Sequence, residues 1–241
     1  MAVYSQTAMA IAINDLQLAG FVNAAEVTTS ADTKDVTTFG SAGHRQSVVG
    51  LATFMLKTSG FQDQVGPSPA TAFTPSTIGA IDSFTVSIPG TAVADVAYIG
   101  TALDTKISES AAVGEVAPFS VDWTGTGRIV RGQLLHPAAA RTATGNGTAT
   151  PFVTPTATQS LWASFHVHSV TGTGTITFTV QTDDNVGMAT PVTRITSTAF
   201  AAIGGEVRSL AGALAAETHI RVVYTIVGFT SVTLTVAAGT A

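Results

Sequence analysis

Hydrophobic and polar residues alternate with a period of two along much of the chain. The run from 83 to 88, SFTVSI, places its apolar side chains on one face and its Ser and Thr side chains on the other. The same alternation recurs in the runs 175–180, 220–227 and 231–236. Such alternation is typical of half-buried β-strands, which Thr, Val, Ile and Phe favour. The pattern therefore predicts an all-β protein.

Clusters of turn-forming residues separate these runs, at 124–127 (TGTG), 171–174 (TGTG) and 182–185 (TDDN). Many short strands between turns indicate a sandwich or a barrel. Helical segments are few. The run 74–83, TPSTIGAIDS, is a candidate for a short helix, and the alanine-rich run 205–217 fits either a helix or a strand with its turn.

The stretch from 137 to 159 is poor in large apolar residues and rich in Pro, Gly and Thr, so it is interpreted as a linker or a long loop. We therefore expect a two-sheet β-sandwich over residues 1–140, a linker or loop over 141–159, and a second, smaller β-sandwich over 160–241.

Composition adds one constraint. Charged residues make up 10% of the chain, against about 25% in a typical soluble domain, while 45% of residues are hydrophobic. Interface cores are depleted in charge, so this composition predicts extensive contacts between subunits. No apolar run approaches the roughly 18 residues that a membrane span requires, and no basic residue precedes Lys34, so neither a membrane span nor a secretory signal is expected.

Candidate chemistry is sparse. His166 and His168 would share one face of a strand, and a metal site would need a third ligand from Asp183, Asp184 or His219. The favoured interpretation places this pair on the solvent side of its strand. Asp183, Asp184 and Asn185 lack the spacing of a calcium loop, and they suit a turn between strands better.

Enzyme motifs are missing from the sequence. There is no cysteine, no G-x-S-x-G motif, and no pair of carboxylates apart from the adjacent Asp183 and Asp184. We therefore predict no enzymatic activity, no catalytic residue, no cofactor and no metal site. The net charge of −5 and the absence of a basic cluster argue against a surface that grips nucleic acid.

One stretch, from 29 to 63, is distinctive: TSADTKDVTTFGSAGHRQSVVGLATFMLKTSGFQD. It resembles the front half of the tail tube (major tail) proteins of phages with long non-contractile tails and of related gene transfer agents. The matching positions are Asp35, Thr37, Thr38, Phe39, Gly40, Ser41, Gly43 and Arg45, followed by Gly50, Leu51, Ser59, Gly60, Phe61 and Asp63. The run 114–137 is also similar to this family, so the resemblance covers roughly residues 5–137. The run 162–185 looks like a sandwich attached to such virion proteins.

This resemblance implies a structural virion protein. Subunits of the family assemble into rings, typically hexameric, that stack into a hollow tube through which DNA passes. It further implies a segment that contacts a neighbouring subunit, formed by Thr37, Thr38, Phe39, Gly40, Ser41, Gly43 and Arg45. The implied partners are further copies of the chain, the tape measure, the terminator and the baseplate. The implied location is the virion tail, after assembly in the host cytoplasm.

A conduit must let DNA slide. A strongly basic wall would hold DNA by counterion release, so the shortage of Lys and Arg agrees with a neutral or acidic bore. A ring of Arg45, Arg128 and Arg131 in the bore would contradict this expectation. Two alternatives stay open: another virion β-sandwich protein (a capsid decoration, tail terminator or baseplate component), and a carbohydrate-binding module. The second is disfavoured because aromatic platforms for sugars are scarce in a chain with two Trp and three Tyr.

Overall fold

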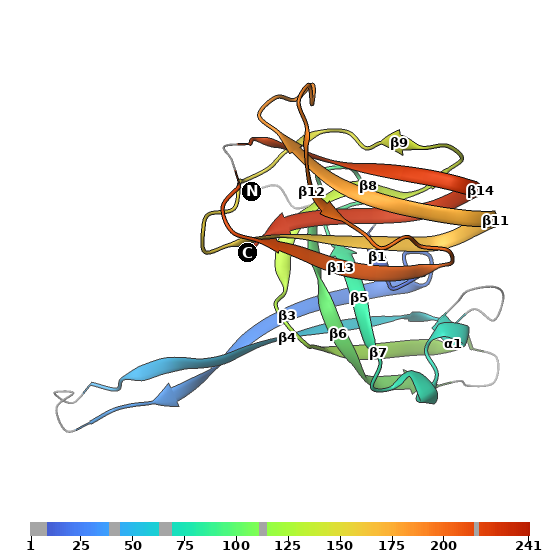
Figure 1. The fold of residues 1–241 in the computed structure, drawn as a ribbon. Coiled ribbons are helices and arrows are strands. Elements are labelled where there is room, and N and C mark those ends of the chain that lie inside the picture. The colour runs from blue at the N-terminus through green and yellow to red at the C-terminus, as the bar shows by residue number, and fades with distance from the viewer. Residues whose placement is uncertain (1–8, 39–43, 63–68, 111–114, 215–216) are drawn as a thin grey trace.

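The computed structural model describes residues 9–38, 44–62, 69–110, 115–214 and 217–241, and Figure 1 shows that strands are the predominant element in them. The all-β prediction is confirmed. The first part of the chain contains β1 (Ala10–Ile13), β2 (Leu16–Gln17), β3 (Val22–Asp35), β4 (Ser47–Phe61), α1 (Pro69–Ala72), η2 (Pro75–Thr77), β5 (Ile81–Ser87), β6 (Val96–Glu109), β7 (Pro118–Gly125) and β8 (Val130–Arg141). The second contains β9 (Gly145–Asn146), β10 (Thr150–Pro151), β11 (Ser160–Asp183), β12 (Val192–Thr196), β13 (Gly204–Ala211) and β14 (His219–Thr240).

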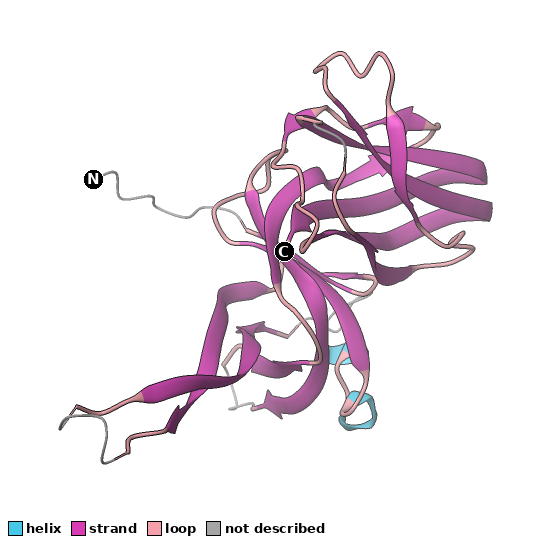
Figure 2. Ribbon diagram, turned by 60° about the vertical axis from the view of Figure 1, so that its left-hand side comes forward, coloured by secondary structure: helices cyan, strands magenta, loops and turns pink. Residues whose placement is uncertain are grey.

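The strands form one antiparallel network whose main path is β12-β11-β14-β8-β6-β5-β1-β2. A side branch of the network starts at β6 and has the order β6-β7-β4-β3. Figure 2 shows that helix is confined to one short region. The candidate helix over 74–83 was therefore mostly wrong: a 3-10 turn covers 75–77, and β5 begins at Ile81. The alanine-rich run 205–217, for which a helix or a strand was expected, begins within strand β13 (Gly204–Ala211).

A first core lies between a layer containing β4 and β7 and a layer containing β1 and β5. Phe54 of β4 meets Phe84 of β5 with ring centroids 5.5 Å apart, and Trp123 of β7 is fully buried beside them. Strand β6 pairs with both β5 and β7, so it joins the two layers. The alternating apolar residues of these strands point inward and supply most of this core.

A second core lies within a folded ribbon made by β11 and β14. These strands pair from Leu161↔Thr240 to Asp183↔His219, and the ribbon bends so that its two halves face each other. Phe165 and Phe178, from the two halves of β11, stack 5.4 Å apart. Gly172 (φ +89°) and Gly228 (φ +83°) provide the left-handed backbone at the bend. The turn predicted at 171–174 was wrong, because β11 continues through it with register shifts.

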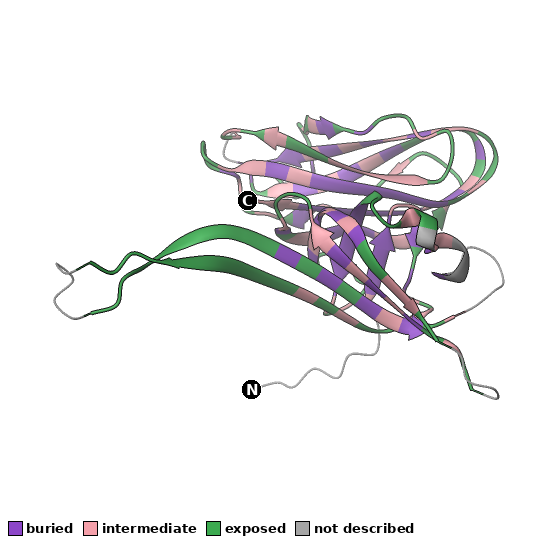
Figure 3. Cartoon of the chain, turned by 90° about the horizontal axis from the view of Figure 1, so that it is seen from below, coloured by how far each residue is buried: buried purple, intermediate pink, exposed green. Residues whose placement is uncertain are grey.

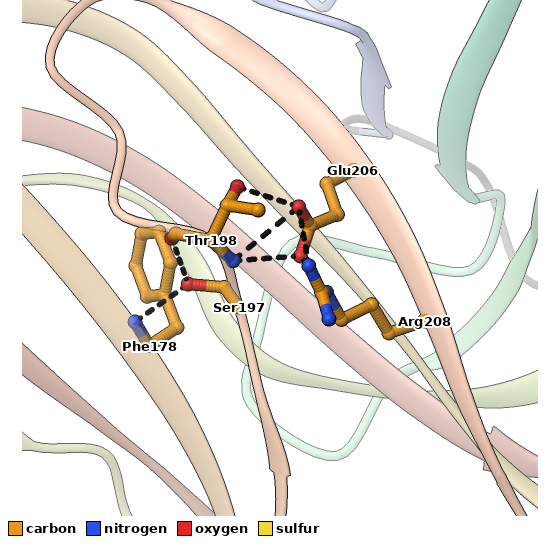
Figure 4. A network of polar contacts seen from close by, with 5 residues as sticks. All are labelled: Phe178, Ser197, Thr198, Glu206 and Arg208. Carbon is orange, nitrogen blue, oxygen red and sulfur yellow. Dashed lines mark hydrogen bonds and ion pairs between the residues drawn. The ribbon is translucent and has the colours of Figure 1, made fainter.

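A polar network ties the strands around this second core together (Figure 4). The backbone N–H of Phe178 donates to Ser197 Oγ at 2.9 Å, and Thr198 donates to the carboxylate of Glu206 through its N–H and its hydroxyl. Arg208 pairs with the same carboxylate. Burial raises the pKa of Glu206, but the hydrogen bonds from Arg208 and Thr198 outweigh this effect, so the pKa of Glu206 is lowered. The network connects β11, the segment after β12, and β13.

The two cores are joined by strand pairing and by a smaller third apolar cluster, which lies between them and consists of Ala10, Ala97, Ile99, Val130, Leu134 and Ala237. Strand β8 pairs with β6 on one side and with β14 on the other, and β9 and β10, which lie in the predicted linker, both pair with β14. In addition, the polar face of β5 is covered: Thr85 contacts Ser164 and His166 of β11. The prediction that the run 83–88 is half-buried was wrong, since both of its faces are buried. The division into two sandwiches and a linker stays a prediction.

Candidate functional site

The most distinctive surface of the molecule is a projecting hairpin. Every described residue from 28 to 38 and from 44 to 53 is exposed, on both faces of the ribbon. We call the stretches 28–38 and 44–53, which include the second part of β3 and the first part of β4, the arm. It extends away from the two cores in Figure 1, and Figure 3 shows it as one continuous exposed segment. A ribbon exposed on both faces forms no core of its own.

The arm has two unpaired edges. Strand β3 pairs only with β4 within the described residues, and β4 meets its other partner, β7, only from Met55 onward. Each free edge presents backbone N–H and C=O groups that another strand can pair with. Natural edges are commonly protected by proline, lysine or bulges. The arm sequence contains no proline and a single lysine, Lys34, and its β3 strand has one register shift, between Ala31 and Thr33.

Apolar side chains are exposed along the arm. Leu51 is 84% exposed and Val49 is 74% exposed, and Val36 and Val48 are also exposed. Met55, which lies just beyond the arm at its base, is exposed as well. Large apolar side chains at neighbouring exposed positions mark interaction sites more often than isolated ones do. The arm therefore combines unpaired backbone with uncovered apolar surface.

The end of the arm is held by local hydrogen bonds. Asp35 accepts from the backbone N–H of Thr37 and from Arg45 Nε, each at 2.9 Å. The Gln46 N–H donates to Thr37 Oγ1 at 2.9 Å, across the hairpin. Hydrogen bonds from Thr37 and then from Arg45 lower the pKa of Asp35. These contacts fix the two strands relative to each other next to the tip.

The predicted contact residues fall at this end of the arm. Thr37 and Thr38 end its first described stretch, and Arg45, whose side chain is 78% exposed, lies near the start of the second. The remaining predicted residues lie outside the described residues: Phe39, Gly40, Ser41 and Gly43. Their role in subunit contact stays a prediction. The sequence did not reveal that the arm is exposed on both faces, because Thr and Val favour strands whether or not these are covered.

The histidine pair is buried, so its expected place on a solvent-facing strand surface was wrong. His166 is fully buried, and His168 nearly so. Each Nδ1 lies against a backbone carbonyl of the β1–β2 turn: His166 against Asn14 O at 2.7 Å, and His168 against Asp15 O at 2.8 Å. The turn and β5 cover this face of β11. Burial lowers the pKa of both rings, that of His166 to about 3.

A second buried polar group was missed from the sequence. Asp82 and Asp104 lie close together beside the first core, although they are far apart along the chain. Burial, followed by the charge of Asp82, raises the pKa of Asp104 to about 7. The sequence shows no pair of carboxylates besides Asp183 and Asp184 and cannot exclude partners on distant strands, and the structure brings Asp82 and Asp104 together in this way. The alternating pattern around Asp82 could have indicated the face of the strand on which its side chain lies. It could not have identified a partner on another strand.

Asp183 behaves as the turn interpretation predicts. Its carboxylate accepts from the backbone N–H groups of Asn185 and Thr190 at 3.1 and 2.8 Å. Among the described residues, no three His, Asp or Glu side chains are grouped as a metal site made of protein ligands requires. No described helix has the length and apolar character needed to cross a membrane.

Solved structures to which the chain is similar come from virion components. No family model and no curated protein matches the chain. A chain of a native gene transfer agent virion covers 53% of this chain and 97% of its own length, at 18% identity and a TM-score of 0.43. A chain from the tail of an empty gene transfer agent particle, computed with C6 symmetry, covers 48% and 91%, at 19% identity and a TM-score of 0.40.

A third similar structure extends over both parts of the chain. It is the Dit protein of phage SPP1, described as a paradigm of the hub adsorption apparatus in phages that infect Gram-positive bacteria. It covers 97% of this chain and 99% of its own length, at 10% identity and a TM-score of 0.34. These three are structures to which the chain is similar, and at such scores they define no family.

Proposed function

We propose that the chain is a tail tube subunit, which assembles into stacked rings around a bore that conducts DNA. The observation that carries the proposal is the arm. A two-stranded ribbon is marginally stable in water on its own. An arm with two bare edges and exposed Leu51 and Val49 gains its burial from other copies of the chain.

The free edge of β3 gives this assembly a mechanism. Pairing of β3 with a strand of the next subunit would continue the sheet from subunit to subunit and remove the exposed edge. If the pairing closes into a ring, no edge is left over. The resemblance of the 29–63 stretch to tail tube proteins supports the same role, and it assigns the tip of the arm to contact with a neighbour.

Charge also fits a conduit. The chain has ten Lys and Arg against fifteen Asp and Glu, and a bore built from such subunits would not hold the phosphate backbone strongly. DNA would pass without sequence-specific contacts. On this proposal the protein is structural and its partners are copies of itself and the other tail proteins.

Electron microscopy of the purified protein tests the proposal. We expect wild-type protein to form tubes with a central bore at high concentration. Leu51→Asp places a charge where we propose a contact, so it should abolish tubes while leaving the melting temperature of the subunit within about 2 °C, because the side chain is exposed. Val186→Asp, at a position 63% exposed and outside the arm, is the matched control and should assemble normally.

Other outcomes have defined meanings. Small closed oligomers would favour a capsid decoration, terminator or baseplate component over a tube. Monomers that bind glycan arrays would favour a carbohydrate-binding module. Tubes formed equally well by the Leu51 variant would contradict the role given to the arm.

A further inference from the structure

A cavity of about 260 Å³ lies beside the first core. Its wall combines the β1–β2 turn, the segment from α1 to Ala80, and the paired strands β5 and β6. The side chains that line it include Asn14, Phe73, Thr77, Asp82 and Asp104. None of the described residues that line it is Lys, Arg or His.

Two carboxylates meet in this cavity because of strand register. Asp82 on β5 pairs with Ala102 on β6, and Asp104 lies two residues further along β6, on the same face. Asp82 is 7% exposed and accepts a hydrogen bond from the Asn14 side-chain amide. Asp104 is 1% exposed, and neither of its carboxylate oxygens has a well-aligned hydrogen bond to a described residue, although the side chains of Thr77 and Trp123 lie near enough to lower its pKa against the effect of burial.

A buried carboxylate without a partner is costly, and a second carboxylate beside it adds to the cost. A bound cation removes both costs. Oxygen donors select hard cations, and a site with two carboxylates and room for water suits Mg²⁺, which keeps several of its waters. The cavity has the volume of several water molecules, each occupying about 30 Å³ in the liquid.

We propose that this cavity binds a hydrated divalent cation, Mg²⁺, through the carboxylates of Asp82 and Asp104. A third acidic residue, Asp15, also lines the cavity, but it is not grouped with the pair as a metal ligand in the described residues, so the cation completes its coordination shell with water. Bound there, it links β5 to β6 and stabilises the wall formed by the β1–β2 turn and η2. This site is independent of tube assembly and does not rest on it.

Thermal unfolding of the chelator-treated full chain, under conditions where it stays unassembled, tests the site. MgCl₂ should raise the melting temperature by roughly 5 °C or more at 100 times Kd. A parallel titration with CaCl₂ tests the choice of cation, because the proposal expects the smaller effect from Ca²⁺. Asp104→Asn should abolish the response, and Asp184→Asn, the same change at an exposed turn position, should keep it.

A direct binding measurement distinguishes a lost site from a misfolded variant. Trp123 packs edge-on against Phe73 of the cavity wall, with ring centroids 5.4 Å apart. Terbium(III) bound in the cavity should therefore give luminescence excited through tryptophan, which MgCl₂ competes away. Trp123→Phe should abolish this signal, and Trp162→Phe should retain it.

The absence of any cation binding would contradict the proposed site. If the melting temperature does not respond to either cation and terbium luminescence is absent from the wild-type chain, the two carboxyls share a proton and there is no metal site. In that case Asp104→Asn should be at least as stable as wild type at every salt concentration.

Discussion

At the scale of single residues, the buried histidines show how side-chain chemistry specifies the packing of β11 against the β1–β2 turn. A carbonyl oxygen can only accept, so Nδ1 of each ring carries the proton and donates to Asn14 O or Asp15 O. The other nitrogen then accepts a hydroxyl hydrogen, from Thr85 for His166 and from Thr235 for His168. Both rings are satisfied as neutral imidazoles.

Acid should therefore destabilise the protein through these residues. The pKa of His166 is about 3 in the folded chain, because of burial and then the neighbouring His168, against about 6.5 unfolded. The unfolded chain thus binds more protons below pH 6.5, and stability is full above that pH and falls as the pH drops. The expected slope approaches about 1.4 kcal/mol per pH unit for each such histidine.

Urea unfolding of wild type and His166→Gln at pH 7 and pH 5 measures this effect. The variant should lose less stability between the two pH values, by about 1 to 2 kcal/mol, whatever its stability at pH 7. His44→Gln, at an exposed position in the arm, should have the wild-type pH dependence. Equal pH dependence in wild type and His166→Gln would contradict the assignment of a neutral buried ring.

At the scale of elements, the bend of the β11–β14 ribbon depends on backbone that only glycine adopts readily. Gly228 has a φ of +83°, and a Cβ there would lie 2.5 Å from the carbonyl oxygen of Thr173. Gly228→Ala should therefore lower the free energy of unfolding by about 1 to 3 kcal/mol, through left-handed strain and the clash. Urea unfolding checks this value.

Gly20→Ala is the matched control for that bend. A Cβ on Gly20 would meet nothing within 4 Å, so we expect a change within about 0.5 kcal/mol. Equal effects of the two substitutions would mean that the ribbon accommodates a side chain at its bend.

The same bend explains why the sequence predicted the strand segments of β11 and β14 but not their continuity. Alternation located the strands within β11 and β14, because one face of each strand packs into a core. It did not reveal that the runs 220–227 and 231–236 form one continuous strand, since Gly and Thr between alternating runs suit both a turn and a bend. Nor did it reveal the buried polar face of β5, because Thr85 is buried by a histidine from a distant strand.

At the scale of the whole molecule, the sequence predicted the fold class and not the way in which the two cores are connected. The pairing of β8 with β14 joins residues about 100 apart in the chain, and its pairing with β6 joins residues more than 30 apart, so no local pattern encodes either. Gly132 and Gly239 lie opposite each other in the β8–β14 pair, where a Cβ on either would approach the other strand within 3 Å. The requirement for small residues there is visible only once the strands are placed.

Limited proteolysis with a nonspecific protease tests how independent the two cores are. The segment 141–159 holds β9 and β10, both paired with β14, and the Gln133 side chain donates to Thr150 and to the carbonyl of Pro151 at 2.9 Å. Backbone held in this way resists cleavage, because a protease must first open it. We therefore expect the native chain to survive uncut between 141 and 159, as judged by the intact masses of its fragments, while a urea-unfolded sample is cut there. Early release of two stable fragments, one ending and one beginning within this segment, would instead establish two separable domains joined by a linker.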